Sequence, residues 1–331
     1  MSPILEIEDL RIRFRSKNRL QAMLSRDDDP FIDAVCSVSL AIDPGETMAL
    51  VGESGAGKTT IGRAVIGLNE AKGGSIRYRD QELIGLSEAA FKSVRRDIAM
   101  MFQDPVGSLS PRLSVGKLIT EPFKIHNISD TDLSAEANRL LELVGLPPSF
   151  ATVYAHQLSG GQARRVGVAR ALALSPKIII ADEPTAGLDV SVQGEILNLM
   201  NRLQEETGVS FLIITHNLNV VRHISHSMAI MYLGRFVEYG RTDDIFAQPL
   251  HPYTNALLSA NPNPDPDHQK EALKLHGEIP SLMNRPEGCE FHPRCPFVQN
   301  HCRSNPPEIK RLDGDRHVAC HYPLTGNSQS V

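Results

Sequence analysis

Gly52-Glu53-Ser54-Gly55-Ala56-Gly57-Lys58-Thr59 is the stretch that decides the fold of this chain. It matches the pattern G-x-x-x-x-G-K-[ST], and it lies between a short apolar run at 47–51 and a helical pattern at 60–68. In such a strand, loop and helix unit, backbone N–H groups surround phosphate oxygens, the lysine reaches the β- and γ-phosphates, and the threonine hydroxyl binds Mg²⁺. We therefore expect an α/β nucleotide-binding fold, and we assign the whole stretch, together with Thr60, to the nucleotide.

A second apolar run, 177–181, ends in the acidic pair Asp182 and Glu183. A short continuous run of this kind is typical of a parallel strand buried on both faces, and such sheets bind ligands beyond the carboxyl ends of their strands. Asp182 is then placed to bind Mg²⁺ together with Thr59. Glu183 points in a different direction, where it can polarise water at the γ-phosphate. The alternative is a strand that ends in two solvated acids.

Two further strand patterns end in polar side chains that could reach the same edge. The run 209–215 precedes His216, and the run 98–102 precedes Gln103. A lone histidine at such a position is more often structural, and a single amide means little by itself. Both residues gain meaning only because the phosphate loop fixes where this edge of the sheet lies.

The segment Leu158-Ser159-Gly160-Gly161-Gln162 stands at the start of a helical pattern that continues to residue 172. Ser159 is a good N-cap, and the two glycines allow a ligand to approach the backbone closely. Unpaired N–H groups and the positive end of the helix dipole favour phosphate oxygens there. The alternative is an ordinary Ser-Gly-Gly turn that caps a surface helix.

Taken together, these motifs resemble the ATP-binding cassette family in order and spacing. The resemblance implies ATP and Mg²⁺ as ligands and a mixed sheet core with an antiparallel β layer and a helical insert at about 104–165. It assigns catalysis to Glu183, the γ-phosphate switch to His216, and contact with both Mg²⁺ and the attacking water to Gln103. It also makes Asp189 a residue that signals across a dimer.

The chain has a single P-loop, so Ser159, Gly160, Gly161 and Gln162 are expected to serve ATP bound to a second cassette subunit. Phe14, at the end of the first strand, is our choice for the aromatic side chain that stacks on adenine. An apparent insertion at 15–30 leaves Phe31 as the alternative.

The composition narrows the class of protein. No apolar run approaches the roughly 18 residues that a membrane span needs, and the first residues lack the layout of a signal peptide. We therefore expect a soluble cytoplasmic protein. A net charge of −5 and a pI near 6.2 argue against general nucleic-acid binding.

The region from 251 onward is expected to be a separate small extension that follows a cassette at 1–250. The stretch 261–267 is a proline-rich polar linker. Beyond it lie Cys289, Cys295, Cys302 and Cys320, whose spacing does not match the C-x₂₋₄-C hairpins of ordinary zinc modules. A four-thiolate iron–sulfur cluster, a Cys₄ zinc site and reduced structural thiols all remain open.

His251-Pro252-Tyr253-Thr254 and the run 288–296, GCEFHPRCP, resemble the C-terminal extension of oligopeptide and dipeptide importer ATPases. In that family the cysteines are associated with a 4Fe–4S cluster, which the resemblance favours over zinc. The resemblance implies ATP-driven import of peptides, with a second ATPase subunit, two permease subunits and an extracytoplasmic peptide-binding protein as partners. The chain would then lie at the cytoplasmic face of the inner membrane, held there by the permease.

Other functions remain open at this point. Relatives with nearly the same cassette import nickel, a metallophore or glutathione. A non-transport ATPase is a second alternative, and a tail that senses redox state or iron is a third.

Overall fold

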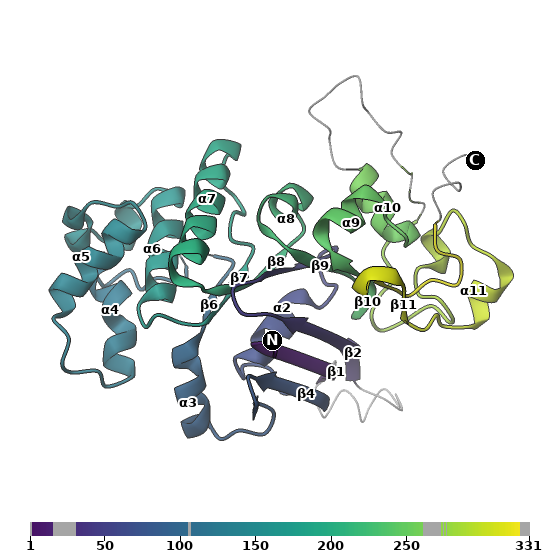
Figure 1. Ribbon diagram of the computed structural model, residues 1–331, viewed down its shortest axis with the longest axis horizontal. Coiled ribbons are helices and arrows are strands. Elements are labelled where there is room, and N and C mark those ends of the chain that lie inside the picture. Colours follow the sequence, from purple (N-terminus) through teal and green to yellow (C-terminus); the bar gives the residue numbers. More distant parts are fainter. Residues whose placement is uncertain are drawn as a thin grey trace, which may run out of the picture.

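The computed structural model describes residues 2–15, 31–104, 107–260, 273, 275 and 277–324. The predicted linker at 261–267 and most of the predicted insertion, 16–30, lie outside the described residues. Two sheets organise the described part, with helices packed above and beside them (Figure 1).

The larger sheet has 8 strands in the order β11-β12-β10-β9-β3-β8-β7-β6. Its central strands β9, β3, β8, β7 and β6 pair in parallel, so their carboxyl ends meet at one edge. Residues of β3, β7 and β8 are buried throughout, as their continuous apolar runs predict. The strands are β3 (Thr47–Val51), β6 (Ile98–Met101), β7 (Ile178–Asp182), β8 (Ser210–Thr215), β9 (Ser227–Tyr232), β10 (Arg235–Arg241), β11 (Lys310–Arg311) and β12 (His317–Val318).

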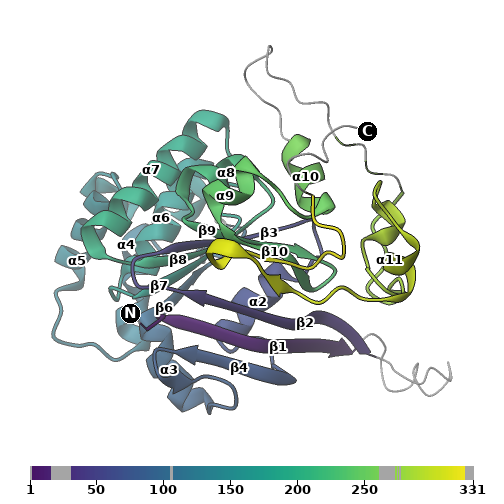
Figure 2. The same ribbon diagram turned by 45° about the vertical axis from the view of Figure 1, so that its right-hand side comes forward.

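A smaller antiparallel sheet, with the order β2-β1-β4-β5, forms the predicted second layer (Figure 2). Its strands are β1 (Leu5–Arg15), β2 (Phe31–Ile42), β4 (Gly73–Tyr78) and β5 (Gln81–Glu82). Helix α2 (Lys58–Val65) shares one core with both sheets. A Cβ added at Gly62 would lie 2.8 Å from the Ile214 side chain, so glycine lets α2 approach the large sheet closely.

A second core joins the far side of the large sheet to the helical insert, which lies at the left of Figure 1. The insert contains α4 (Val115–Ile125), α5 (Leu133–Leu143) and α6 (Gly160–Leu172). The remaining helices of this body are α3 (Glu88–Asp97), α7 (Val190–Thr207), α8 (Leu218–Ile224) and α9 (Thr242–Ala247).

Residues beyond 250 pack onto this body and extend its sheet. Strand β12 pairs with β10 through Glu238 and Val318, and β11 pairs with β12. Helices α10 (Pro252–Ser259) and α11 (Asn300–Ser304) complete this region. Tyr253 and Phe291 belong to the same buried cluster as Val51 of β3, so the extension shares a core with the rest of the chain. The boundary expected near residue 250 therefore separates two stretches of sequence, but these two stretches do not form separately packed cores.

In the part of the chain that the structure describes, no helix is both long and apolar enough to cross a membrane.

Candidate nucleotide site

The phosphate loop, residues 52–59, connects β3 to α2. Gly57 precedes the helix in a left-handed conformation, and no side chain caps the first N–H groups of α2. Those groups are consequently available to an anion. Gly52 is also required, because a Cβ there would lie 2.2 Å from the Met231 carbonyl oxygen. The loop thus packs directly against β9.

Lys58 is buried and folds back onto its own loop. Its Nζ donates hydrogen bonds to the Gly52 carbonyl at 2.7 Å and to the Glu53 carbonyl at 2.9 Å. Burial lowers the pKa of Lys58, against the opposing attraction of Glu183, Asp182 and Glu53. Both accepting carbonyls belong to the loop, so the ammonium group is already held where a phosphate would be bound.

Thr59 and Asp182 meet as the sequence predicts. The Thr59 hydroxyl donates to the Asp182 carboxylate at 3.1 Å. Burial raises the pKa of Asp182, and the hydrogen bond from Thr59 opposes that rise. A hydroxyl and a carboxylate are the hard oxygen donors that Mg²⁺ prefers, so this pair fits the expected ion.

Glu183 and His216 lie in direct contact at the carboxyl edge of the sheet. The Nδ1 atom of His216 is 2.6 Å from the Glu183 carboxylate, which also accepts from the Thr215 hydroxyl at 3.1 Å. Glu183 has φ 50°, a left-handed conformation that costs energy for a side chain other than glycine. Its backbone N–H bonds the Ile214 carbonyl at 2.8 Å, which fixes this conformation. The carboxylate is therefore aimed by its neighbours.

Gln103 and the segment 186–189 are joined by a residue that sequence reasoning missed. Arg164 of α6 donates to the Gln103 carbonyl at 3.2 Å and to the Ala186 carbonyl at 3.0 Å. Arg164 is 1% exposed. The two adjacent arginines at 164 and 165 give no signal that one of them is buried, so the sequence could not single it out.

Asp189 caps α7. Its carboxylate accepts from the Val192 N–H at 3.0 Å and from the Ser191 hydroxyl at 2.7 Å. The Val192 and Ser191 hydrogen bonds hold the pKa of Asp189 below its usual range. The predicted role in a dimer is not visible in one chain, and the observed role is that of an N-cap.

Ser159 caps α6, as predicted for the Leu158–Gln162 segment. Its hydroxyl oxygen accepts from the Gln162 N–H at 3.3 Å, and the Gln162 side chain accepts from the Ser159 N–H at 2.9 Å. A Cβ at Gly161 would lie 2.7 Å from the Val192 side chain, so this glycine lets α6 approach α7. In both ribbon views the helix α6 lies with the insert, whereas α2 lies between the two sheets.

Phe14 and Phe31 lie on opposite faces of the smaller sheet. Phe14 pairs with Ile32, and the next pair along the two strands is Arg15 with Phe31. Because successive residues of a strand point to opposite faces, Phe14 and Phe31 point to opposite faces of the sheet. Phe14 therefore shares its face with the buried Ile12, which belongs to the core that contains α2. Phe31 lies beneath the guanidinium groups of Arg13 and Arg15. This arrangement favours Phe14 as the aromatic residue on the nucleotide side.

The four cysteines of the extension lie near one another. Burial raises the pKa of the Cys295 thiol to about 11 and that of Cys320 to about 12, and Cys289 and Cys302 add to both rises. Nevertheless, within the described ranges no group of three or more Cys, His, Asp or Glu side chains is arranged to hold a metal ion. As they stand, the thiols do not fit an iron–sulfur cluster or a zinc ion. The fifth cysteine, Cys36, lies on β2.

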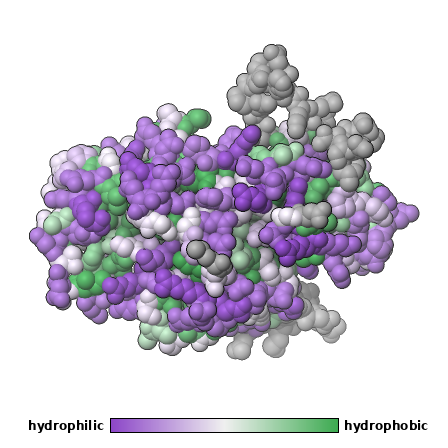
Figure 3. All heavy atoms as spheres, in the orientation of Figure 1, coloured by the Kyte–Doolittle hydropathy of each residue, from purple (hydrophilic) through white to green (hydrophobic). Residues whose placement is uncertain are grey.

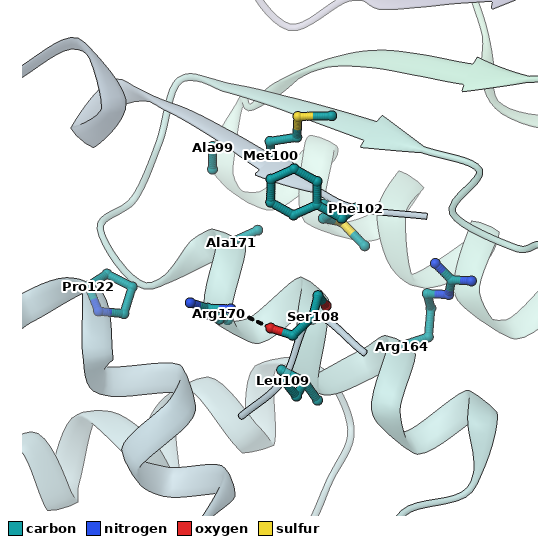
Figure 4. A pocket seen from close by; sticks show the side chains of 11 residues that line it. Ala99, Met100, Phe102, Ser108, Leu109, Pro122, Arg164, Arg170 and Ala171 are labelled. Atoms are coloured by element: carbon teal, nitrogen blue, oxygen red, sulfur yellow. Dashed lines mark hydrogen bonds between the residues drawn. The ribbon is translucent and has the colours of Figure 1, made fainter. Parts of the chain in front are cut away.

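A hollow of about 200 Å³ lies beside the site, between β6, α4 and α6 (Figure 4). Met100 and Phe102 line one wall, and Arg170 donates to the Ser108 carbonyl at the other. Phe102 is 40% exposed and directly precedes Gln103. In Figure 3 most of the visible face is hydrophilic, and apolar patches occur on the left, where Figure 1 shows the helical insert.

Comparison with known proteins places this geometry in a family. Residues 35–186 match the ABC transporter family, and residues 237–302 match the oligopeptide/dipeptide transporter C-terminal region. The oligopeptide transport ATP-binding protein AppF of Bacillus subtilis is 44% identical over 96% of this chain and 97% of its own length. OppF of Escherichia coli, with the same description, is 43% identical over 93% of this chain and 92% of its own length. The chain belongs to the ATP-binding subunits of the oligopeptide/dipeptide ABC transporter family.

Further similarities agree with this assignment. The di/tripeptide transport ATP-binding protein DppF of Pseudomonas aeruginosa is 43% identical over 88% of this subunit and 90% of its own length. Among solved structures, the ATP-binding cassette MJ0796, a dimer in a post-hydrolysis state with ADP and phosphate, has a TM-score of 0.63 and 27% identity. It covers 72% of this subunit, which covers 98% of that chain. The predicted cassette fold is thereby confirmed.

Proposed function

We propose that this subunit hydrolyses ATP to drive the import of peptides through a separate membrane permease. The observation that carries the proposal is the meeting of Lys58, Thr59, Asp182, Glu183 and His216 at one edge of the sheet. The names of the relatives, which are transport proteins for oligopeptides and di- or tripeptides, support the substrate class.

The residues divide the chemistry between them. Lys58 leaves the loop carbonyls and binds the β- and γ-phosphates. Mg²⁺, held by Thr59 and Asp182, neutralises charge on the phosphates when it is bound. Glu183 orients the attacking water, and His216, which is more exposed than Glu183, binds the γ-phosphate from the side. Gln103 contacts the ion and the water, and Phe14 stacks on adenine.

The helix start at Ser159, Gly160 and Gly161 serves ATP bound to another ATPase subunit. A single phosphate loop is present in the sequence, and α6 lies with the insert rather than beside α2. A helix N-terminus with a serine cap supplies N–H groups to phosphate oxygens. Asp189, at the start of the neighbouring helix α7, then communicates with the partner subunit.

The hollow beside Phe102 receives a segment of the permease. It combines the exposed Phe102 with Arg170, which bonds both the Ser108 carbonyl and Glu121, and it adjoins Gln103 at the nucleotide edge. A permease segment seated there would move with the Gln103 loop. The assembly we propose contains two ATPase subunits, two permease subunits and an extracytoplasmic peptide-binding protein, with this subunit on the cytoplasmic face of the inner membrane.

The experiment is peptide uptake and ATP hydrolysis by the assembled transporter with Glu183→Gln in this subunit. We expect hydrolysis and uptake to fall at least about a hundredfold while ATP binding persists. Glu195→Gln, a surface acid of α7 that bonds Arg165, is the matched control and should change neither. Hydrolysis at the wild-type rate in the Glu183 variant would refute the catalytic assignment. Uptake of nickel or glutathione in place of peptides would refute the substrate class.

An iron–sulfur cluster held by Cys289, Cys295, Cys302 and Cys320 is a separate hypothesis about the extension. The proximity of the four thiols speaks for it, and the lack of a ligand group among the described residues speaks against it. Anaerobic purification, followed by metal analysis and visible absorption spectroscopy, distinguishes an extension that holds an iron–sulfur cluster from one that does not. Equal amounts of iron and sulfide, together with visible absorption, would establish the cluster, and metal-free protein would exclude it.

A further inference from the structure

Glu53, the second residue of the phosphate loop, is held by the C-terminal extension. The Arg294 guanidinium donates to both carboxylate oxygens of Glu53, at 2.8 and 2.9 Å. The backbone N–H of Glu53 donates to the Tyr253 hydroxyl at 3.1 Å. Two residues of the extension thus contact the same loop residue, one through its side chain and one through its backbone.

Both contacting residues are fixed by packing. Tyr253 is 0% exposed, and its ring lies 4.9 Å from that of Tyr232 and 5.4 Å from that of Phe291. The Arg294 guanidinium lies over the Tyr232 ring at 5.8 Å. Arg294 is 7% exposed, so this bidentate pair differs from the solvated ion pairs that contribute little. The aromatic cluster therefore determines where Glu53 lies.

The charge of Glu53 makes this contact important for an anionic ligand. Lys58 Nζ donates to the Glu53 carbonyl at 2.9 Å. Burial lowers the pKa of Lys58, and the Glu53 carboxylate is one of the three acids that oppose this shift. The carboxylate thus lies near the group that binds phosphate. An unpaired negative charge on a residue of the phosphate loop would repel the triphosphate, whereas a bidentate arginine neutralises it and holds it toward the extension.

We propose that Arg294, supported by Tyr253, is a positioning residue for nucleotide binding, which neutralises Glu53 and fixes the phosphate loop from the extension. The extension therefore forms part of the nucleotide site of its own subunit. This inference rests on the proposed binding of ATP by the phosphate loop and does not depend on what the transporter carries.

The test is the affinity of the purified full-length subunit for ATP, measured by calorimetry at low salt. Arg294→Met should raise the Kd at least about tenfold, because it leaves the Glu53 carboxylate unpaired beside the ligand. Adding Glu53→Gln to that variant should restore most of the affinity, since the repelling charge is then gone. Higher salt should narrow the difference between Arg294→Met and the wild type.

Arg316→Met is the matched control. Arg316 also joins the extension to the cassette through a buried ion pair, at 2.6 Å, but its partner Glu238 belongs to β10 and not to the phosphate loop. This variant should lose stability and keep the wild-type Kd for ATP. Tyr253→Phe, which removes one hydroxyl from a packed ring, tests the backbone contact and should raise the Kd by a smaller factor.

Three outcomes would overturn the inference. They are a folded Arg294→Met protein with the wild-type Kd, a double variant that recovers no affinity, and an Arg316→Met protein that loses affinity equally. If Arg294→Met does not fold, two other proteins take its place: the single variant Tyr253→Phe and the double variant that combines Glu53→Gln with Tyr253→Phe. An unchanged Kd for ATP in both would overturn the inference. Lys58→Ala separates the two proposals: if it leaves ATP binding intact, the site itself is wrong.

Discussion

Replacing Arg164 by methionine would test whether a buried side chain couples the Gln103 loop to the segment that begins at Ala186. Arg164 is 1% exposed and donates to one carbonyl in each segment, at 3.2 and 3.0 Å. Methionine retains most of the apolar stem but leaves both carbonyls without their donor. Each loss costs about 1–3 kcal/mol when water cannot replace the donor.

Water can reach one of these carbonyls, because Gln103 is exposed and Ala186 is half-buried. We therefore take the low end of this range for each carbonyl and expect Arg164→Met to lower the free energy of unfolding by about 2 kcal/mol in total. At about 2.1 cal/mol/K of unfolding entropy per residue, a chain of 331 residues would then show a fall in Tm of roughly 3 °C. The larger effect should be on hydrolysis, because the two segments that flank Glu183 would no longer move together, and we expect turnover to fall about tenfold or more.

The assays are thermal unfolding by circular dichroism and ATP turnover at saturating ATP. Arg165→Met is the control, because the adjacent arginine on the same helix bonds the Val144 carbonyl and Glu195 and touches neither segment. It should lose comparable stability and retain turnover. Wild-type turnover in Arg164→Met, at a temperature where the protein is folded, would refute the proposed coupling.

Two other variants test separate parts of the site, and a third tests the pH dependence of stability. Ser159→Arg should leave the ATP affinity of its own phosphate loop unchanged and reduce turnover about a hundredfold or more, and weakened ATP binding with a normal fold would count against a role toward the partner. Thr215→Val removes the hydroxyl that donates to Glu183 at 3.1 Å, and should lower turnover about fivefold at unchanged ATP affinity, as steady-state kinetics would show. His251 has a pKa lowered to about 3 by burial, so between pH 6.5 and 3 the unfolded chain binds the extra proton and stability falls as the pH falls. Between pH 7 and pH 5 this histidine should lower the free energy of unfolding, measured with urea, by about 2 kcal/mol. The variant His251→Asn can still accept the hydrogen bond from the Tyr253 N–H and should lack this part of the pH dependence. An equal loss of stability in both proteins would exclude His251 as its source.

The parts of the fold that the sequence predicts are those with local signals. The strand at 47–51, the glycine-rich loop and the helix after it follow one another without interruption, and the structure confirms all three. The apolar run 177–181 similarly predicts a buried strand that ends at Asp182, because residues of a central strand have no solvated face. Since the carboxyl ends of parallel strands share an edge, the meeting of Glu183 and His216 could be inferred as well.

The contacts of single polar residues over long sequence distances could not be predicted. Arg164 follows a helical pattern that gives no sign of its burial, and Arg294 is separated from Glu53 by 241 residues. The proline-rich linker suggested an independent extension, yet β12 pairs with β10 and Tyr253 packs in the cassette core. Proline and polar residues mark where a chain leaves regular structure, and they carry no information about where it returns.

The distance between Glu53 and Arg294 also sets an order of events during synthesis. When the phosphate loop leaves the ribosome, the arginine that pairs with its carboxylate has not been made, and 241 further positions separate the two residues. At 5–20 residues per second, that interval is roughly 10–50 s. For that time a nascent subunit can form β3 and α2 but cannot complete the surroundings of its phosphate loop. A chain released before Arg294 has been made would therefore have a phosphate loop that lacks this support.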